Sequence, residues 1–150
     1  MDTLLITRDD LDADGVYAKA ESIDCAGHVE VAADLGTVRV RGFVRAKGRI
    51  RCLAGSGIES GSGIEAGEGI EAGEGIKAGW GIKAGEGIEA GEGIEAGFSI
   101  VAKFLSVRLR IFAGLVAWRL PEPSECEVRA EIRSGTLAHG THVAPVEVKS

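Results

Sequence analysis

The feature that most limits the fold of this chain is a six-residue repeat in its middle. Residues 57–98 form seven consecutive hexads: GIESGS, GIEAGE, GIEAGE, GIKAGW, GIKAGE, GIEAGE and GIEAGF. In each hexad the second and fourth positions are apolar or small and the third is charged, which is typical of a short strand between glycine turns. A helix is disfavoured because two glycines in six residues would each cost about 1 kcal/mol in its interior. The repeat therefore predicts stacked short strands that share one apolar interior.

The same frame continues upstream of the perfect hexads, with small insertions between the blocks. The second positions of these blocks predict an inward-facing series that leads into the isoleucines of the hexads: Val16, Ile23, Val29, Val38, Val44 and Ile50. The fourth positions predict a second inward series: Ala18, Cys25, Val31, Val40, Ala46 and Cys52. We therefore expect the repeat region to begin near Gly15 and to end at residue 103.

The charged positions indicate how many hexads make one coil. Strands of neighbouring coils lie about 4.8 Å apart, so stacked side chains of opposite sign attract each other. Grouping the hexads in threes gives columns whose signs alternate almost throughout: Tyr17, Arg39, Glu59, Lys77 and Glu95; Asp24, Arg45, Glu65 and Lys83; Glu30, Arg51, Glu71 and Glu89. Grouping in twos places Arg39 and Arg51 in one column. The chain is therefore predicted to be all-β, a three-sided β-helix of about 18 residues per coil.

The two ends of the chain are expected to close this β-helix. Residues 1–14 are interpreted as an N-terminal cap segment, and residues 15–103 as the hexapeptide-repeat β-helix. Residues 104–150 show longer alternation, with Val107, Leu109 and Ile111 on one face, and two prolines mark a turn at 121–123. We expect these residues to form a small antiparallel β cap, because an uncovered strand edge promotes aggregation.

Several glutamates lack a basic partner in the predicted columns. The sixth hexad positions stack Glu68 under Glu86 and Glu74 under Glu92, and a third column holds Ser62, Trp80 and Phe98. Like charges in one column contribute no stability, which suggests that a partner uses them. The candidate partner-binding residues are Glu68, Glu74, Glu86, Glu89, Glu92, Trp80 and Phe98. The alternative is a solvated face that only keeps the protein soluble.

The basic segment at residues 37–51 does not by itself indicate nucleic-acid binding. It contains six basic side chains and no acidic ones. In the three-sided arrangement Arg39, Arg45 and Arg51 each stack next to acidic residues of the neighbouring coils. We therefore expect no direct contact with nucleic acid, and a protein partner with a basic surface, or self-association, instead.

The search for catalytic, cofactor and metal motifs is negative. Cys25, Cys52 and Cys126 form no C-x-x-C pair, and His139 and His142 have no nucleophile or carboxylate arrangement near them in the sequence. The glycine-rich repeats match neither a phosphate loop nor a dinucleotide-binding turn. The hexads also lack the catalytic histidine and the long extruded loop of the hexapeptide acyltransferases. We expect no enzyme activity, no catalytic residue, no cofactor and no metal.

Composition adds a prediction about location. The chain of 150 residues carries a net charge of -6, and no segment approaches the about 20 consecutive apolar residues of a membrane span. No stretch near the first residue has the pattern of a signal peptide. A cytoplasmic protein without membrane contact is therefore expected.

The segment GFVRAKGRIRCLAG and the Gly-Ile-Glu-Ala-Gly runs resemble the bactofilins, bacterial cytoskeletal β-helix proteins. The resemblance covers residues 15–103 and implies assembly into filaments through the ends of the β-helix. A second analogy, based on surface charge, is to pentapeptide-repeat solenoids that imitate DNA, a strategy also used by phage anti-restriction and anti-CRISPR proteins.

These observations leave two main hypotheses about function. The first is a non-enzymatic protein-binding module that presents a rigid acidic and aromatic face to a basic surface, a specific form of which is a nucleic-acid-mimicking inhibitor in anti-defence. The alternative is a self-assembling, bactofilin-like structural protein. A third hypothesis is an enzyme on a solenoid scaffold.

Overall fold

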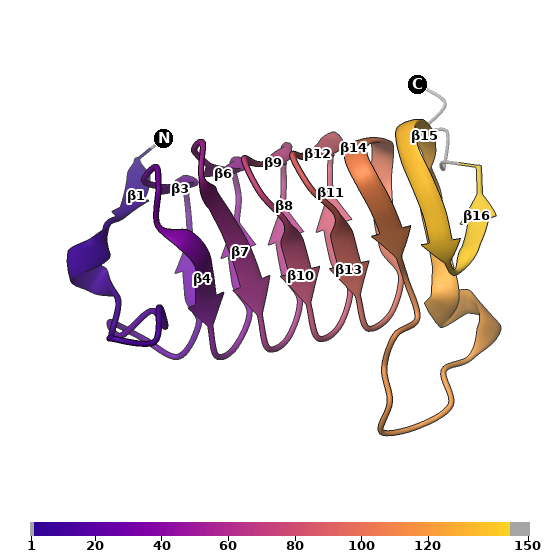
Figure 1. Ribbon diagram of the computed structural model, residues 1–150, viewed down its shortest axis with the longest axis horizontal. Coiled ribbons are helices and arrows are strands. Elements are labelled where there is room, and N and C mark those ends of the chain that lie inside the picture. The colour runs from indigo at the N-terminus through magenta and orange to yellow at the C-terminus, as the bar shows by residue number, and fades with distance from the viewer. Residues whose placement is uncertain (1, 145–150) are drawn as a thin grey trace.

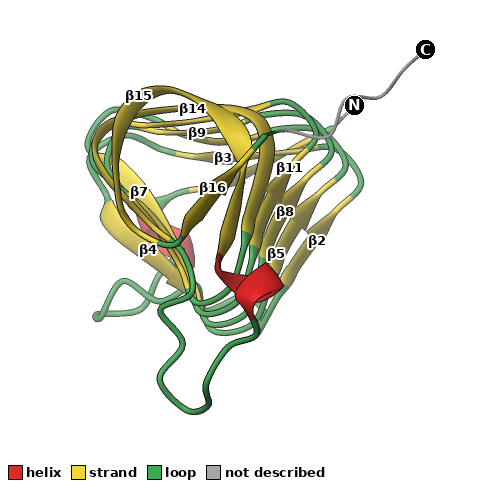
Figure 2. Cartoon of the chain, turned by 90° about the vertical axis from the view of Figure 1, so that its right-hand side faces the viewer, coloured by secondary structure: helices red, strands yellow, loops and turns green. Residues whose placement is uncertain are grey.

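The computed structural model describes residues 2–144, and within them the chain winds as a three-sided parallel β-solenoid (Figure 1). Seen from its C-terminal end, the solenoid has a triangular cross-section (Figure 2). The prediction of an all-β, three-sided β-helix is confirmed. In residues 2–144 the helices are two short 3-10 turns, η1 (Arg8–Asp10) and η2 (Pro123–Cys126). No helix in the described residues is long and apolar enough to cross a membrane.

Each side of the prism is a ladder of parallel strands. Face one contains β1 (Thr3–Ile6), β3 (His28–Val31), β6 (Ile50–Cys52), β9 (Ile70–Ala72) and β12 (Gly87–Ala90). Face two contains β4 (Gly36–Val40), β7 (Ser56–Ser60), β10 (Ile76–Ala78) and β13 (Ile94–Ala96). Face three contains β2 (Ile23–Cys25), β5 (Val44–Ala46), β8 (Ile64–Ala66) and β11 (Ile82–Ala84). The last strands are β14 (Ile100–Phe112) and β15 (Glu127–His139), which bend around all three faces, and β16 (Thr141–Val143).

The core is built from columns of identical residues. On face two, Ile76 lies beside Ile58 of the preceding coil and Ile94 of the next, and all three are buried. The fourth-position alanines fill the remaining space of the narrow interior. Buried branched side chains that stack on their own kind exclude water along the whole axis, and burying each one contributes about 1.5–3 kcal/mol. The predicted inward series is thus confirmed from Ile23 onward.

The charge ladder is also present on the outside of the prism. Arg39 Nε lies 3.2 Å from Glu59 Oε2, and Lys77 Nζ lies 3.4 Å from Glu95 Oε2. Equivalent pairs join Arg45 to Glu65 at 3.8 Å and Arg51 to Glu71 at 3.5 Å. Each pair is largely exposed, so it contributes less than about 1 kcal/mol, and the ladder sets the register more than the stability.

The fifth-position glycines allow successive coils to approach each other at the corners. A methyl group on Gly79 would overlap the carbonyl oxygen of Gly61 in the coil below, and Gly85 has the same relation to Gly67. The first position is less uniform: a methyl group on Gly75 would come no closer than 3.5 Å to another atom, the carbonyl oxygen of Gly93, whereas one on Gly57 would overlap the carbonyl oxygen of Gly75. Close contact with the backbone of the neighbouring coil therefore requires glycine at the fifth position, whereas the surroundings of Gly75 do not require it.

The first coil differs from the prediction by one residue. Val16 and Ala18 were expected to face inward, but the buried residue is Tyr17, and Val16 pairs with Arg39. The cause is the turn before it, where the Asp12 carboxylate accepts hydrogen bonds from the Asp14 and Val16 amides. These bonds lower the pKa of Asp12. The parallel stack also begins earlier than Gly15, because β1 already pairs with β3 inside the expected cap segment 1–14.

The prediction of an antiparallel C-terminal cap is wrong. β15 pairs with β14 in parallel, and β16 pairs with β15 in parallel. Inward and outward residues alternate in the same way in parallel and antiparallel ladders, so the pattern of residues 104–143 could not distinguish them. The chain continues to wind in the same sense, and an excursion between β14 and β15 brings it back to face three. Residues 145–150 of the expected cap lie outside the described residues.

A matched pair of glycine substitutions tests the close approach at the corners. We expect Gly79→Ala to lower the free energy of unfolding by about 1–3 kcal/mol, because the added methyl group overlaps a backbone oxygen that cannot move alone. Gly75→Ala should change it by less than about 0.5 kcal/mol. Urea denaturation of both variants measures the difference, and equal stabilities would contradict the role assigned to the fifth position.

Candidate functional site: an acidic face and an aromatic corner

The predicted glutamates lie together on one side of the prism. On face one, Glu71 of β9 and Glu89 of β12 are stacked on each other. The column of Glu68 and Glu86 forms the corner between faces three and one, and the column of Glu74 and Glu92 forms the corner between faces one and two. In each corner column the amide of the upper glutamate donates to the carbonyl of the lower one, at 3.3 Å. We call these residues the acidic patch: Glu68, Glu71, Glu74, Glu86, Glu89 and Glu92.

The two rows of the acidic patch differ in their ion pairing. The lower row is formed by Glu68, Glu71 and Glu74, and the upper row by Glu86, Glu89 and Glu92. Glu71 pairs with Arg51, and Glu68 Oε2 lies 4.0 Å from Arg49 Nε and 3.8 Å from His28 Nδ1. Glu68 was expected to be unpaired, and this is wrong because His28, the first residue of β3, and Arg49, which precedes β6, reach the same corner. Within residues 2–144 no ion pair is formed by Glu74 or by the upper row. The unpaired negative charge is therefore concentrated in the upper row, which consists of the exposed residues Glu86, Glu89 and Glu92.

Basic residues border the acidic patch along the solenoid axis. In the next coil the Lys103 amide donates to the Glu86 carbonyl, and the Leu109 amide donates to the Glu92 carbonyl. Leu109 is flanked by Arg108 and Arg110, which are both exposed. On face one itself, the residue that stacks on Glu89 in the next coil is Ser106. The patch is thus a compact negative area of two coils rather than a continuous acidic side.

Trp80 and Phe98 do not belong to this surface. They stack at the corner between faces two and three, where the Phe98 amide donates to the Trp80 carbonyl at 3.3 Å. In a triangular prism this corner lies opposite face one, as Figure 2 shows for the loops below β5 and β7. The structure therefore brings the glutamates together and separates them from the two aromatic residues, which cannot contact one flat partner surface at the same time.

The aromatic corner carries a long loop that was not expected. After β14 the amides of residues 114–116 still donate to carbonyls of residues 96–98 at the corner, and residues 117–122 then project beyond it (Figure 1). The ring of Trp118 meets Phe98 edge-on, with 6.0 Å between the ring centroids, and the Arg119 guanidinium stacks on both rings. Phe98 is therefore partly covered, and Trp80 is the exposed member of the predicted pair. The two prolines of this segment indicated a turn, but not its length.

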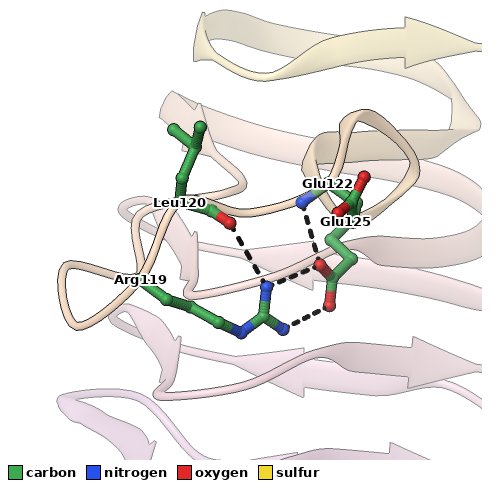
Figure 3. Close-up of polar contacts among 4 residues, drawn as sticks. All are labelled: Arg119, Leu120, Glu122 and Glu125. Atoms are coloured by element: carbon green, nitrogen blue, oxygen red, sulfur yellow. Dashed lines mark hydrogen bonds and ion pairs between the residues drawn. The ribbon is translucent and has the colours of Figure 1, made fainter.

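A single ion pair closes the base of this loop (Figure 3). Arg119 donates through both terminal nitrogens to Glu125, with N–O distances of 2.9 and 2.7 Å. The Glu122 amide donates to the same carboxylate at 2.9 Å. The Arg119 hydrogen bonds, followed by the Glu122 amide, lower the pKa of Glu125 to about 2. We call this arrangement the loop latch.

The cysteines and histidines have structural surroundings. Burial raises the pKa of the Cys52 thiol to about 12, which makes a reactive thiolate unfavourable at neutral pH. A ring nitrogen of His139 lies 2.6 Å from the Ala113 carbonyl oxygen, and one of His142 lies 2.6 Å from that of Ala130. In the part of the chain that the structure describes, no three His, Cys, Asp or Glu side chains are grouped so as to hold a metal ion.

The loop latch makes a prediction about pH. Because the pKa of Glu125 falls from 4.5 to about 2 when the latch forms, the carboxylate stabilises the closed loop above pH 4.5, and this stability is lost as the pH falls toward 2. In a Trp80→Phe background, the fluorescence of Trp118 should change over this interval, and Glu125→Gln should remove the transition. Glu127→Gln, which removes the pair with Arg129 on β15, is the control and should leave the transition in place.

Comparison with known proteins does not assign a family or a function to the chain. No protein-family model matches the chain, and no curated protein or solved structure is similar to it.

Proposed function

We propose that this protein is a non-enzymatic binding module whose acidic patch docks on a basic surface of a partner protein. The observation that carries the proposal is the upper row of the patch, where Glu86, Glu89 and Glu92 are exposed and unpaired within the described residues. On the other two faces the same coils carry Lys77 and Lys83 at the third hexad position. Face one alone places glutamate over glutamate, at Glu71 and Glu89.

The patch has the physical properties of a preorganised electrostatic surface. Stacked glutamates on neighbouring strands lie about 5 Å apart and repel each other, so they weaken the ladder where alternation would strengthen it. The backbone that carries them is hydrogen-bonded to the coils on both sides, so little conformational freedom is lost when a partner binds. Complementary charge on the partner would accelerate the encounter and select the partner.

Mimicry of nucleic acid is a specific form of this proposal. A regular array of negative charges on a rigid support resembles the phosphates that a nucleic-acid-binding surface neutralises with lysine and arginine. A partner that binds the acidic patch through such a surface would be inhibited, because its substrate and this protein compete for the same cations. The buried thiol of Cys52 and the backbone-engaged histidines support a role in binding rather than in catalysis.

Two triple variants, each of which removes three negative charges, test the role of the acidic patch. Glu86→Gln, Glu89→Gln and Glu92→Gln together remove the upper row, while Asp9→Asn, Asp14→Asn and Glu21→Gln remove exposed carboxylates near the other end. In affinity capture from cell extract at low and moderate salt, we expect the wild type and the second variant to retain the same partner and the first variant to lose it. Added duplex DNA should displace the partner from the wild type if mimicry is correct. Equal capture by all three proteins would refute the docking role.

End-to-end assembly, as in the bactofilins that the repeats resemble, is the second candidate. It is favoured by the two ends of face one. There β1 pairs only with β3, and residues 131–134 of β15 pair only with β14 among the described residues. Leu4 and Ile132 at these ends are only partly buried, so another coil would complete their burial. An unpaired strand edge is a template for a further strand.

Light scattering and negative-stain images distinguish the two candidates. Filaments or a continuous size distribution would support assembly through the ends, and a discrete particle would support the binding module. In the first case Leu5→Lys on β1 should shorten the filaments, because a charge on an edge strand opposes pairing. Arg8→Lys, which conserves charge near the same end, is the control.

A further inference from the structure

The loop between β14 and β15 exposes large apolar side chains far from the acidic patch. Trp118 is 66 % exposed, Leu120 is 91 % exposed and Leu115 is 41 % exposed. Trp80, at the same corner of the prism, is 54 % exposed. Several exposed apolar side chains on one projecting loop are typical of a contact with a protein or a lipid surface.

The structure holds this apolar loop in place. The loop latch joins Arg119 to Glu125, and the Arg119 guanidinium stacks 4.8 Å from the Phe98 centroid and 5.1 Å from the Trp118 centroid. The ring of Phe98 belongs to the corner of the solenoid and supports Trp118 from below. Trp118 and Leu120 are thus presented outward by a fixed base, and neither side chain fills the core.

The placement of charge indicates which surface this loop contacts. Arg119 is the one basic residue of segment 113–126, and Glu125 neutralises it through two hydrogen bonds. The acidic patch lies on the opposite side of the prism, so its carboxylates stay in water when the loop meets an apolar layer (Figure 2). Tryptophan and arginine with flanking leucines are suited to the boundary between lipid headgroups and acyl chains.

We propose that residues 117–121 form an interfacial anchor that inserts Trp118 and Leu120 into the surface of a zwitterionic phospholipid bilayer. This differs from the expectation of no membrane contact, which rested on the lack of a spanning segment, because an interfacial loop needs no span. The projecting loop enters the headgroup region while the solenoid remains outside. Glu122 leaves the segment with a small negative charge, so anionic lipids should weaken the binding rather than strengthen it.

The fluorescence of Trp118 tests this anchor directly. The chain has two tryptophans, so Trp80→Phe leaves Trp118 as the only reporter. With phosphatidylcholine vesicles we expect a blue shift of its emission and quenching by brominated acyl chains, with little dependence on salt. Vesicles that contain phosphatidylglycerol should bind less of the protein.

Two exposed leucines provide a matched pair of variants. Leu120→Ser should weaken vesicle binding about tenfold, because an inserted leucine side chain is lost. Leu109, which is 54 % exposed at the corner of the acidic patch, should tolerate Leu109→Ser without an effect on binding. The triple glutamine variant of the acidic patch should also bind vesicles normally, which separates this inference from the proposed function.

Three results would overturn the anchor. The first is an unchanged Trp118 emission with vesicles, and the second is equal weakening by Leu120→Ser and Leu109→Ser. The third is a dimer in sedimentation that Leu120→Ser abolishes, which would assign the loop to contact with a second copy of the chain.

Discussion

Hydrogen bonding between successive coils is the interaction on which the rest of this structure depends. Each hexad donates to and accepts from the hexads one coil away, so every residue has its own repeat equivalent as a neighbour. This relation places isoleucine on isoleucine in the core and glycine on glycine at the corners. It also makes the surface a lattice in which each charge meets the charge of the same position one coil later.

The lattice explains why similar sequences produce different surfaces. Face two places Lys77 between Glu59 and Glu95, and face three places Lys83 next to Glu65, whereas face one repeats glutamate at Glu71 and Glu89. The hexads that carry these residues differ by one or two side chains, and the backbone is the same. On such a scaffold the few hexad positions that face solvent therefore determine the function, and substitutions at these positions leave the fold unchanged.

The two surfaces that stand out lie on opposite sides of the prism. The acidic patch is hydrophilic and is carried by β9, β12 and the corners on either side of them, while the loop beyond Phe98 is apolar, projecting and closed by the Arg119–Glu125 pair. Contact of the loop with a lipid layer would leave the patch directed toward water and available to a partner. The two proposals are physically compatible because neither surface overlaps the other.

The regular part of the molecule could be predicted from the sequence: the three-sided coil, the isoleucine columns and the ladder of Arg39, Glu59 and Lys77. These features follow from a fixed period, and a period specifies which residues become neighbours without further information. The remaining features depend on the three-dimensional arrangement of the chain. It set Tyr17 in the core through the Asp12 turn, continued the C-terminal strands in parallel, and paired Glu68 with Arg49 across a corner. It also placed Trp80 and Phe98 opposite the glutamates. These outcomes depend on insertions and corners, where the period is interrupted and contacts between distant residues select the conformation.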